Sequence, residues 1–378
     1  MRRAQDVRAG ADPLAKTITY KDAGVDIGAN TRWVAAIEAA MRSTYGPRVP
    51  KVRHGGFAGL FRLDYDEHLF RRSYKKPMLV ACTDGVGTKV LLAVKLNRLD
   101  TIGIDLVAMN VNDLVTCGGE PLLFLDYLAV HKLEPERLVA VMDGIAAGCR
   151  EAGCALLGGE TAEMPDLYRE RDLDLAGFAV GVVERTRVID GSRVAPGDVV
   201  IGLPSSGVHS NGYTLVRKLI ESAGCDLGQR VEELGESLGE ALLRPTRIYV
   251  RAVQDVLRRY RRKRVVAGMA HITGGGLEEN LARAFPHNCD AVLEADAWPV
   301  PPVFEFLRRL GATREEMYKV FNMGIGFALI VRPFYADAVL RTLERAGEKP
   351  LAIGRIRRGS GRVLLRQKPP KRPARVRA

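Results

Sequence analysis

The sequence has no long apolar run and few cysteines among its 378 residues. No stretch approaches the roughly 18 apolar residues that a membrane helix needs, and no apolar segment follows the basic start, so we expect neither a membrane span nor a signal peptide. The six cysteines show neither C-x-x-C pairs nor a dense disulfide framework, which predicts buried, reduced thiols. Together with 47% hydrophobic and 27% charged residues, these absences predict a cytoplasmic globular protein.

Acidic residues are outnumbered by basic ones, which gives a formal net charge of +12. Half of this excess lies from Arg366 onward, where no acid occurs. A second basic cluster, residues 258–264, ends a predicted helix, where cations complement the helix dipole. We therefore expect a solvated helix end and tail and no nucleic-acid partner. A basic nucleic-acid binder is the alternative from another functional class, and steep salt dependence of oligonucleotide binding would reveal it.

The chain divides into four predicted segments. Residues 1–16 are polar and unpatterned, and residues 367–378 are basic and rich in proline, so we expect a mobile start and a disordered tail. Between them, short apolar strands alternate with amphipathic helices. The polar stretch from Arg185 to Gly197 ends in a turn signal, and we therefore place a boundary there, with an N-terminal domain at 17–185 and a C-terminal domain at 186–366.

The fold class predicted from these elements is α+β. The first domain should be an α/β unit with a mixed sheet, because the strands predicted at 122–130 and 175–183 lack helices of standard crossover length around them. The second domain should be an α+β unit with further strands near 199–203, 265–270 and 326–331.

A Walker loop is absent, but another glycine-rich loop is present. The segment Asp84-Gly-Val-Gly-Thr-Lys89 follows an apolar strand and opens a predicted helix. Its glycines let backbone N–H groups approach an anion, although the order of residues differs from G-x-x-x-x-G-K-[ST]. We interpret Asp84 as an oxygen ligand of Mg²⁺ and Lys89 as a phosphate contact. A tight turn capped by Asp84 is the alternative.

Further acids could meet this loop. On one predicted helix, Asp105 and Asp113 lie about 80° apart and about 12 Å along the axis, so they share a face without gripping one ion directly. The helix is otherwise apolar, and its acids therefore need partners. Glu160 follows another apolar strand, so Asp84, Asp113 and Glu160 could converge on a nucleotide-bound Mg²⁺. Solvated acids and a capping acid are the alternatives.

The second domain offers two small-residue loops. Hydroxyl, amide and N–H groups of residues 205–213 suit a phosphate. His271 ends a predicted strand before three glycines and could move a proton or neutralise a phosphate, but a structural histidine is the alternative, as it is for His209. Near the N-terminus, Lys21 could contact nucleotide phosphates or be an ordinary surface lysine.

Several longer segments occur in a fixed order along the chain: Tyr20-Lys-Asp-Ala-Gly-Val-Asp26, Thr83-Asp-Gly-Val-Gly-Thr-Lys89, Gly103-Ile-Asp-Leu-Val-Ala-Met109, Val111-Asn-Asp-Leu114, Gly158-Gly-Glu-Thr-Ala-Glu-Met-Pro165, Ser205-Ser-Gly207, His209-Ser-Asn-Gly-Tyr213, Pro245-Thr-Arg-Ile-Tyr249 and His271-Ile-Thr-Gly-Gly-Gly276. Together they resemble the phosphoribosylformylglycinamidine cyclo-ligase family, also called aminoimidazole ribonucleotide synthetases, from about Ile18 to Ile356. Residues 54–61 depart from the family pattern, with fewer glycines than the family usually shows.

The resemblance implies a two-domain α+β subunit in a homodimer whose N-terminal domains pair their strands. It also implies that ATP drives ring closure of formylglycinamidine ribonucleotide to aminoimidazole ribonucleotide, with release of ADP and phosphate. In the family's proposed mechanism, the amide oxygen attacks the γ-phosphate of ATP, and an amidine nitrogen then closes the ring and expels phosphate. Positioning and charge stabilisation would be the protein's main contribution.

Residue roles are carried over motif by motif, with ATP and Mg²⁺ as cofactors. The resemblance implies catalytic roles for His271, Asp84 and Lys89, ATP contacts from Lys21, Gly85, Gly87 and Asp105, ribonucleotide contacts from Ser206, His209, Ser210 and Asn211, and metal ligation by Asp84, Asp113 and Glu160. Sister enzymes of the same architecture, such as selenophosphate synthetases, thiamine-phosphate kinases and the glutamine-dependent synthetase of the preceding step, are the nearest alternatives. The selenophosphate type should carry an early reactive cysteine, and none precedes Cys82.

Overall fold

The computed structural model describes residues 27–49, 60–62 and 74–366. The predictions for Lys21, the N-terminal segment 1–16, the glycine-containing segment around 54–59 and the tail 367–378 lie outside the described residues. Among the helices that are described, none has the length and apolar character that crossing a bilayer requires.

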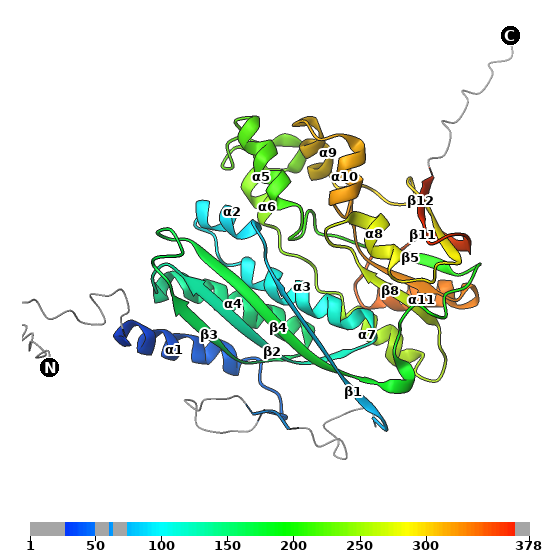
Figure 1. The fold of residues 1–378 in the computed structure, drawn as a ribbon, viewed down its shortest axis with the longest axis horizontal. Coiled ribbons are helices and arrows are strands. Elements are labelled where there is room, and N and C mark those ends of the chain that lie inside the picture. Colours follow the sequence, from blue (N-terminus) through cyan, green and yellow to red (C-terminus); the bar gives the residue numbers. More distant parts are fainter. Residues whose placement is uncertain (1–26, 50–59, 63–73, 367–378) are drawn as a thin grey trace, which may run out of the picture.

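The N-terminal half forms a four-stranded sheet with the order β1-β4-β2-β3 (Figure 1). Strand β4 pairs antiparallel with β1 and β2, whereas β2 and β3 are parallel, so the predicted mixed sheet is confirmed. The parallel pair is joined through a helix, as a parallel connection requires. The strands are β1 (Pro77–Gly85), β2 (Glu120–Val130), β3 (Ala155–Glu163) and β4 (Leu173–Glu184).

Helices α3 (Ile102–Thr116) and α4 (Pro135–Ala152) pack on one face of this sheet, and α1 (Ile27–Arg42) packs against α4. Helix α3 is apolar around most of its surface and is accordingly buried along most of its length. It approaches α4 closely because Gly103 has no side chain. A Cβ at that position would stand 2.2 Å from the backbone oxygen of Val141.

The C-terminal half forms a six-stranded sheet with the order β12-β9-β11-β5-β10-β8. All its neighbouring strands are antiparallel except the pair β9 and β12. Its strands are β5 (Val199–Pro204), β8 (Val266–His271), β9 (Cys289–Glu294), β10 (Ile325–Val331), β11 (Leu351–Arg358) and β12 (Val363–Arg366).

Helices α8 and α11 pack on this second sheet. Two other helices, α6 and α10, were not predicted from the sequence. A separate two-stranded hairpin joins β6 (Arg230–Val231) to β7 (Glu236–Ser237). The other elements are α2 (Lys89–Lys95), α5 (Tyr213–Ser222), α6 (Leu238–Leu243), α7 (Val250–Arg259), α8 (Gly276–Ala282), α9 (Pro302–Arg309), α10 (Arg314–Val320), α11 (Ala336–Arg345), and the 3₁₀ turns η1 (Arg185–Arg187), η2 (Glu232–Leu234) and η3 (Pro333–Tyr335).

Helix α3 also joins the two halves of the molecule, since it packs against β1 and β4 on one side and β8 and α7 on the other (Figure 1). Asn112 donates from Nδ2 to the backbone oxygen of Arg247 at 2.8 Å and accepts from the backbone N–H of Tyr249 at 2.9 Å. Beyond the end of α3, Gln254 of α7 donates to the backbone oxygen of Gly119 at 2.6 Å. These buried bonds fix the second half against the first.

The sheet face opposite α3 is apolar and exposed. Leu79 is 68% exposed, Phe178 is 43% exposed and Leu125 is 36% exposed. Phe178 and Leu125 are direct cross-strand partners, and Leu79 lies further along β1. A contiguous apolar sheet face of this kind is a typical protein interaction surface.

One acid lies unexpectedly inside the N-terminal sheet. Asp126 of β2 is buried, and burial raises the pKa of its carboxyl to about 7. Its side chain lies over Gly159 of β3, where a Cβ would stand 2.4 Å from Oδ1 of Asp126. The glycine therefore makes room for the carboxyl group. Sequence reasoning missed Asp126 because it lies within an apolar strand.

We expect Asp126→Asn to change how stability depends on pH. The folded pKa of about 7 exceeds the ordinary value of 3.8, so the folded state holds more protons between these values, and wild-type stability should fall as pH rises through this window. The variant has no such loss. Between pH 5 and pH 8, its free energy of unfolding should therefore rise by about 2–3 kcal/mol relative to that of the wild type. Urea unfolding at both pH values measures it.

The matched control is Asp143→Asn, which changes an exposed aspartate on α4. It should follow the wild-type pH profile. A parallel profile for Asp126→Asn as well would show that Asp126 does not titrate in this window.

Candidate active site between the two domains

The centre of the candidate site is a histidine–carboxylate pair that bridges the domains. His271 at the end of β8 places Nδ1 2.8 Å from Oδ1 of Asp113 on α3. The His271 side chain is 2% exposed, whereas that of Asp113 is 47% exposed. The buried Nε2 of His271 has no hydrogen-bond partner among the described residues. Because Asp113 can hold a proton on Nδ1, the imidazole can offer Nε2 as a proton acceptor to a ligand.

Asp84 lies near this pair at the end of β1. Its Oδ1 accepts from the backbone N–H of Gly85 at 2.8 Å. Burial raises the pKa of Asp84, the Gly85 bond opposes that rise, and the negative charge of Asp113 adds to it. Two carboxylates that repel each other in a half-buried position form a field that favours a cation or a cationic ligand.

Glu160 does not join these two acids, so the predicted convergence of all three is wrong within one chain. In the sheet register, Asp84 of β1 is level with Gly159 of β3, through Gly177 and Asp126 on the two strands between them. Strands β1 and β3 are the two edges of the sheet, so three strand spacings, about 14 Å, separate them. Glu160 follows Gly159 and therefore points from the other face of the sheet. The described residues contain no group of three or more His, Cys, Asp or Glu that could hold a metal ion.

The physical reason is that the segment predicted as an acidic loop is part of a strand. Strand β3 extends from Ala155 to Glu163 and carries Glu160 within it. The two glycines before Glu160 suggested a turn, but Gly159 is retained in the strand, where it accommodates the Asp126 side chain.

The glycine-rich loop after β1 meets a loop of the second domain. Gly87 has a positive φ of 58°, and a Cβ there would lie 3.8 Å from the backbone oxygen of Ser210. Thr88 and Thr214 bring their hydroxyl oxygens within 3.3 Å of each other. Of the predicted ATP-contacting residues, Gly87 therefore borders the predicted ribonucleotide loop.

Within that second loop, most predicted contacts are engaged inside the protein. His209 is buried, its Nε2 accepts from the backbone N–H of Ser206 at 3.2 Å, and burial lowers its pKa, with His271 contributing further. Ser206 donates to the backbone oxygen of Pro245 at 2.6 Å. His209 is therefore neutral near pH 7 and anchors the loop.

Ser210 and Asn211 lie at the domain contact. The Ser210 hydroxyl is 3.1 Å from that of Thr246, and Asn211 donates to the sulfur of Met109 on α3 at 3.7 Å. Asn211 also approaches the glycine turn after His271, since a Cβ at Gly274 would lie 3.7 Å from its Oδ1. The loop thus adjoins the His271–Asp113 pair.

Lys89 and Asp105 differ from their predicted positions facing ATP. Nζ of Lys89 lies 2.7 Å from Oδ2 of Asp105, and both side chains are fully buried. Lys89 also donates to the backbone oxygen of Arg244 at 2.8 Å, and Oδ1 of Asp105 accepts from the N–H and hydroxyl of Thr246 at 2.7 and 2.6 Å. Burial lowers the pKa of Lys89, and Asp105 opposes that shift. This pair stabilises the domain contact and does not reach an open site.

Sequence models of known families match both halves of the chain. The AIR synthase related protein N-terminal domain matches residues 66–183, and the C-terminal domain of the same family matches residues 195–365. The chain belongs to the AIR synthase related protein family. It is 52% identical over 343 residues to a phosphoribosylformylglycinamidine cyclo-ligase of Syntrophotalea carbinolica, covering 90% of this chain and 95% of that relative. A Desulfitobacterium hafniense protein of the same name is 53% identical over 340 residues, covering 89% and 96%.

Solved structures share the fold of this AIR synthase related chain at much lower identity. Thiamine-monophosphate kinase from Stenotrophomonas maltophilia aligns with a TM-score of 0.62 at 21% identity, over 87% of this chain and 95% of that chain. The hydrogenase maturation protein HypE in complex with ATP aligns with a TM-score of 0.62 at 19% identity, over 93% and 95%. These likenesses show a shared fold.

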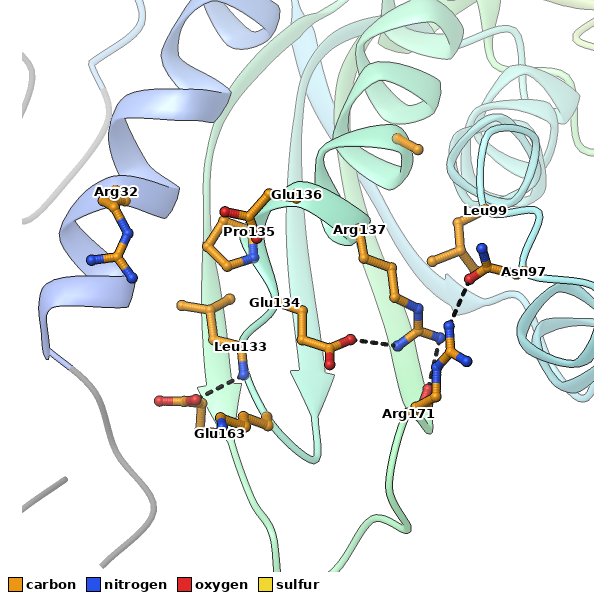
Figure 2. A pocket seen from close by; sticks show the side chains of 12 residues that line it. Arg32, Asn97, Leu99, Leu133, Glu134, Pro135, Glu136, Arg137, Glu163 and Arg171 are labelled. Carbon is orange, nitrogen blue, oxygen red and sulfur yellow. Dashed lines mark hydrogen bonds and ion pairs between the residues drawn. The ribbon is translucent and has the colours of Figure 1, made fainter. Parts of the chain in front are cut away.

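A cavity of about 710 Å³ lies apart from this site, at the start of α4 and beside α1 (Figure 2). None of the described residues predicted to be functional lines it. Figure 2 shows that some of its polar groups bind one another: Arg137 donates to the backbone oxygen of Arg171 at 2.8 Å, and Arg171 donates to Asn97 at 3.0 Å. We therefore leave this cavity outside the candidate active site.

We expect Lys89→Met to destabilise the protein by about 3–5 kcal/mol, because it leaves the Asp105 carboxylate buried without its counter-charge. Adding Asp105→Asn should recover part of this loss, since the amide still accepts from Thr246 without carrying a charge. Urea unfolding of the single and double variants measures the coupling.

A contact to ATP phosphate would give a different result. Lys89→Met would then raise the KM for ATP while leaving the free energy of unfolding within about 0.5 kcal/mol of wild type. That outcome would contradict the structural role of the pair.

Proposed function

We propose that this chain converts formylglycinamidine ribonucleotide and ATP into aminoimidazole ribonucleotide, ADP and phosphate, a step of purine biosynthesis. One observation carries the proposal: a chain about half identical to cyclo-ligases over nine-tenths of its length brings His271, Asp113 and Asp84 together at its domain junction. No Walker loop is needed for the phosphoryl transfer, because acids and glycine-rich turns supply the polar groups.

The reaction has two steps in this proposal. The amide oxygen attacks the γ-phosphorus of ATP, so an oxygen–phosphorus bond forms and the phosphoanhydride bond breaks to release ADP. The amidine nitrogen then attacks the activated carbon, so a carbon–nitrogen bond forms and closes the ring. The bond between that carbon and the phosphorylated oxygen breaks, which releases phosphate. The protein's work is to orient the reacting groups and stabilise charge, as is usual for phosphoryl transfer.

His271 is the group suited to accept the proton that the amidine nitrogen loses. Its Nε2 has no partner in the part of the chain that the structure describes, and Asp113 at 2.8 Å holds the ring and would stabilise the imidazolium that forms. The apolar wall behind the ring includes Phe327, whose ring centroid lies 6.5 Å away. Asp113 acts on the proton through His271.

Mg²⁺ fits the same place. Asp84 and Asp113 offer hard oxygen ligands. Burial raises the pKa of Asp84 and the charge of Asp113 adds to that rise, and a bound cation would favour the ionised form of both acids. When bound with ATP, the ion would neutralise charge on the phosphates. Gly85 and Gly87 would border these phosphates, and Lys21, before α1, would add a cation. Ser206, Ser210 and Asn211 would border the ribonucleotide, with His209 anchoring their loop.

A homodimer is the second part of the proposal. The exposed apolar face around Leu79, Leu125 and Phe178 is suited to a second copy of the N-terminal sheet. Burial of these side chains would remove the largest apolar exposure of the sheet from water.

We expect Asp84→Asn to lower kcat at least about 100-fold, because the site would lose a metal ligand at the transferred phosphate. A coupled assay follows ADP and aminoimidazole ribonucleotide together, starting from formylglycinamidine ribonucleotide and ATP. Asp143→Asn is the control and should retain wild-type turnover. Full activity in Asp84→Asn would contradict the metal assignment, and ADP without ring product in the wild type would indicate a sister kinase.

We also expect Phe178→Glu to dissociate the dimer, since it buries a charge in an apolar interface. Light scattering should show the mass of two chains for wild type and of one chain for the variant. The control is Phe334→Glu, at a phenylalanine that is 87% exposed outside the sheet. A monomeric wild type, or an intact Phe178→Glu dimer, would refute this interface.

A further inference from the structure

A second cavity, of about 250 Å³, lies at the domain boundary between the linker and the second domain. It is separate from the candidate active site, since neither His271 nor the loops around it line it. One wall is the linker after β4, and the other is the end of α7 with the turn that leads into β8. The two walls are thus far apart in the sequence.

The rim of this cavity is strongly basic. All its cations are exposed, and the single acid of the lining, Asp190, already accepts from the backbone N–H of Ser192 at 3.0 Å and from its hydroxyl at 2.6 Å. Positive charges gathered around one cavity repel one another unless an anion neutralises them. The cations of the lining are Arg187, Arg193, Arg261, Arg262, Lys263 and Arg264.

A helix end alone does not account for this rim. Cations in the last turn of α7, Arg258 and Arg259, complement the helix dipole. Arg187 and Arg193, however, come from the linker, and a guanidinium N–H of Arg264 donates to the backbone oxygen of Thr186, which holds the two walls together. The fold therefore brings two independent basic segments to one cavity.

The floor of the cavity is apolar, which restricts the kind of anion. Ile189 and Leu257 are half-buried there, and Val265 and Val266 are buried. Tyr260 lies at the edge, with its ring 5.8 Å from that of Tyr335, and the Lys263 ammonium lies 5.2 Å from the Tyr335 ring. Inorganic phosphate alone would leave this apolar surface uncovered.

We propose that this cavity binds a small phosphorylated metabolite with a flat apolar part, of the mononucleotide class. The arginines would hold the phosphate in bidentate contacts, and the floor would pack against the base. A volume of about 250 Å³ suits a small molecule and not a long polymer. The cavity is also lined by Gly118, two residues beyond the end of α3, and by Val266 at the start of β8, so a bound ligand would lie beside one end of each element that carries the His271–Asp113 pair.

The test uses AMP as the probe, on the full chain saturated with ADP so that the catalytic nucleotide site is filled. Calorimetry should show AMP binding to wild type, with binding at least about tenfold weaker in the double variant Arg261→Ser, Arg262→Ser. The control is Arg357→Ser, Arg358→Ser, an adjacent exposed arginine pair on β11 with the same loss of charge. It should bind AMP as wild type does.

Further measurements distinguish binding at this cavity from binding at the active site and from non-specific attraction of AMP to positive charge. The KM for ATP should be unchanged in the Arg261, Arg262 variant, and adenosine and inorganic phosphate should each bind more weakly than AMP. Equal AMP affinity in all three proteins, equal losses in both variants, or adenosine binding as tight as AMP would overturn the proposal. A ten-nucleotide RNA that binds more tightly than AMP and depends on the same arginines would replace it with a nucleic-acid surface.

Discussion

The buried ion pair between Lys89 and Asp105 is the contact on which the domain arrangement depends. Each partner also bonds to the second domain, Lys89 through the backbone of Arg244 and Asp105 through Thr246. Removing two charges from water costs free energy. The attraction between the charges offsets this cost only when they lie in good ion-pair geometry and their other donors and acceptors are hydrogen-bonded. Domain docking completes these bonds, so the arrangement of the two domains and the state of the pair are coupled.

This docking places one face of α3 against the second domain. Asp105, Met109, Asn112 and Asp113 follow helical spacing, and each meets the second half of the chain. The side chains of Asp105, Met109 and Asn112 are engaged in contacts between the two halves, whereas the Asp113 side chain is half-exposed and contacts His271. One helix thus fixes the domains and holds the proposed catalytic pair, so a shift in how the domains dock should affect the proposed chemistry directly.

The sequence was sufficient for the mixed sheet and most helices, because apolar periodicity and turn residues are local signals. It grouped Asp84 and Asp113 with Glu160, whereas the fold brings His271 to Asp113. The prediction that acids on the buried helix need partners is confirmed for Asp105, which pairs with Lys89. The sequence did not reveal that Lys89 was the partner of Asp105, since that pairing depends on tertiary packing. Glu160 was misplaced because its glycines suggested a loop, whereas Gly159 makes room for Asp126 within a strand. The basic cavity joins two segments that no local pattern relates.

The central claim is that ring closure takes place at the domain junction, at the His271–Asp113 pair beside Asp84. A crystal structure of the protein with a non-hydrolysable ATP analogue, Mg²⁺ and formylglycinamidine ribonucleotide tests it most directly. We expect the reacting amide within hydrogen-bond reach of His271 Nε2 and the terminal phosphate near Asp84. Both ligands bound elsewhere, for example in the cavity at the start of α4, would contradict it.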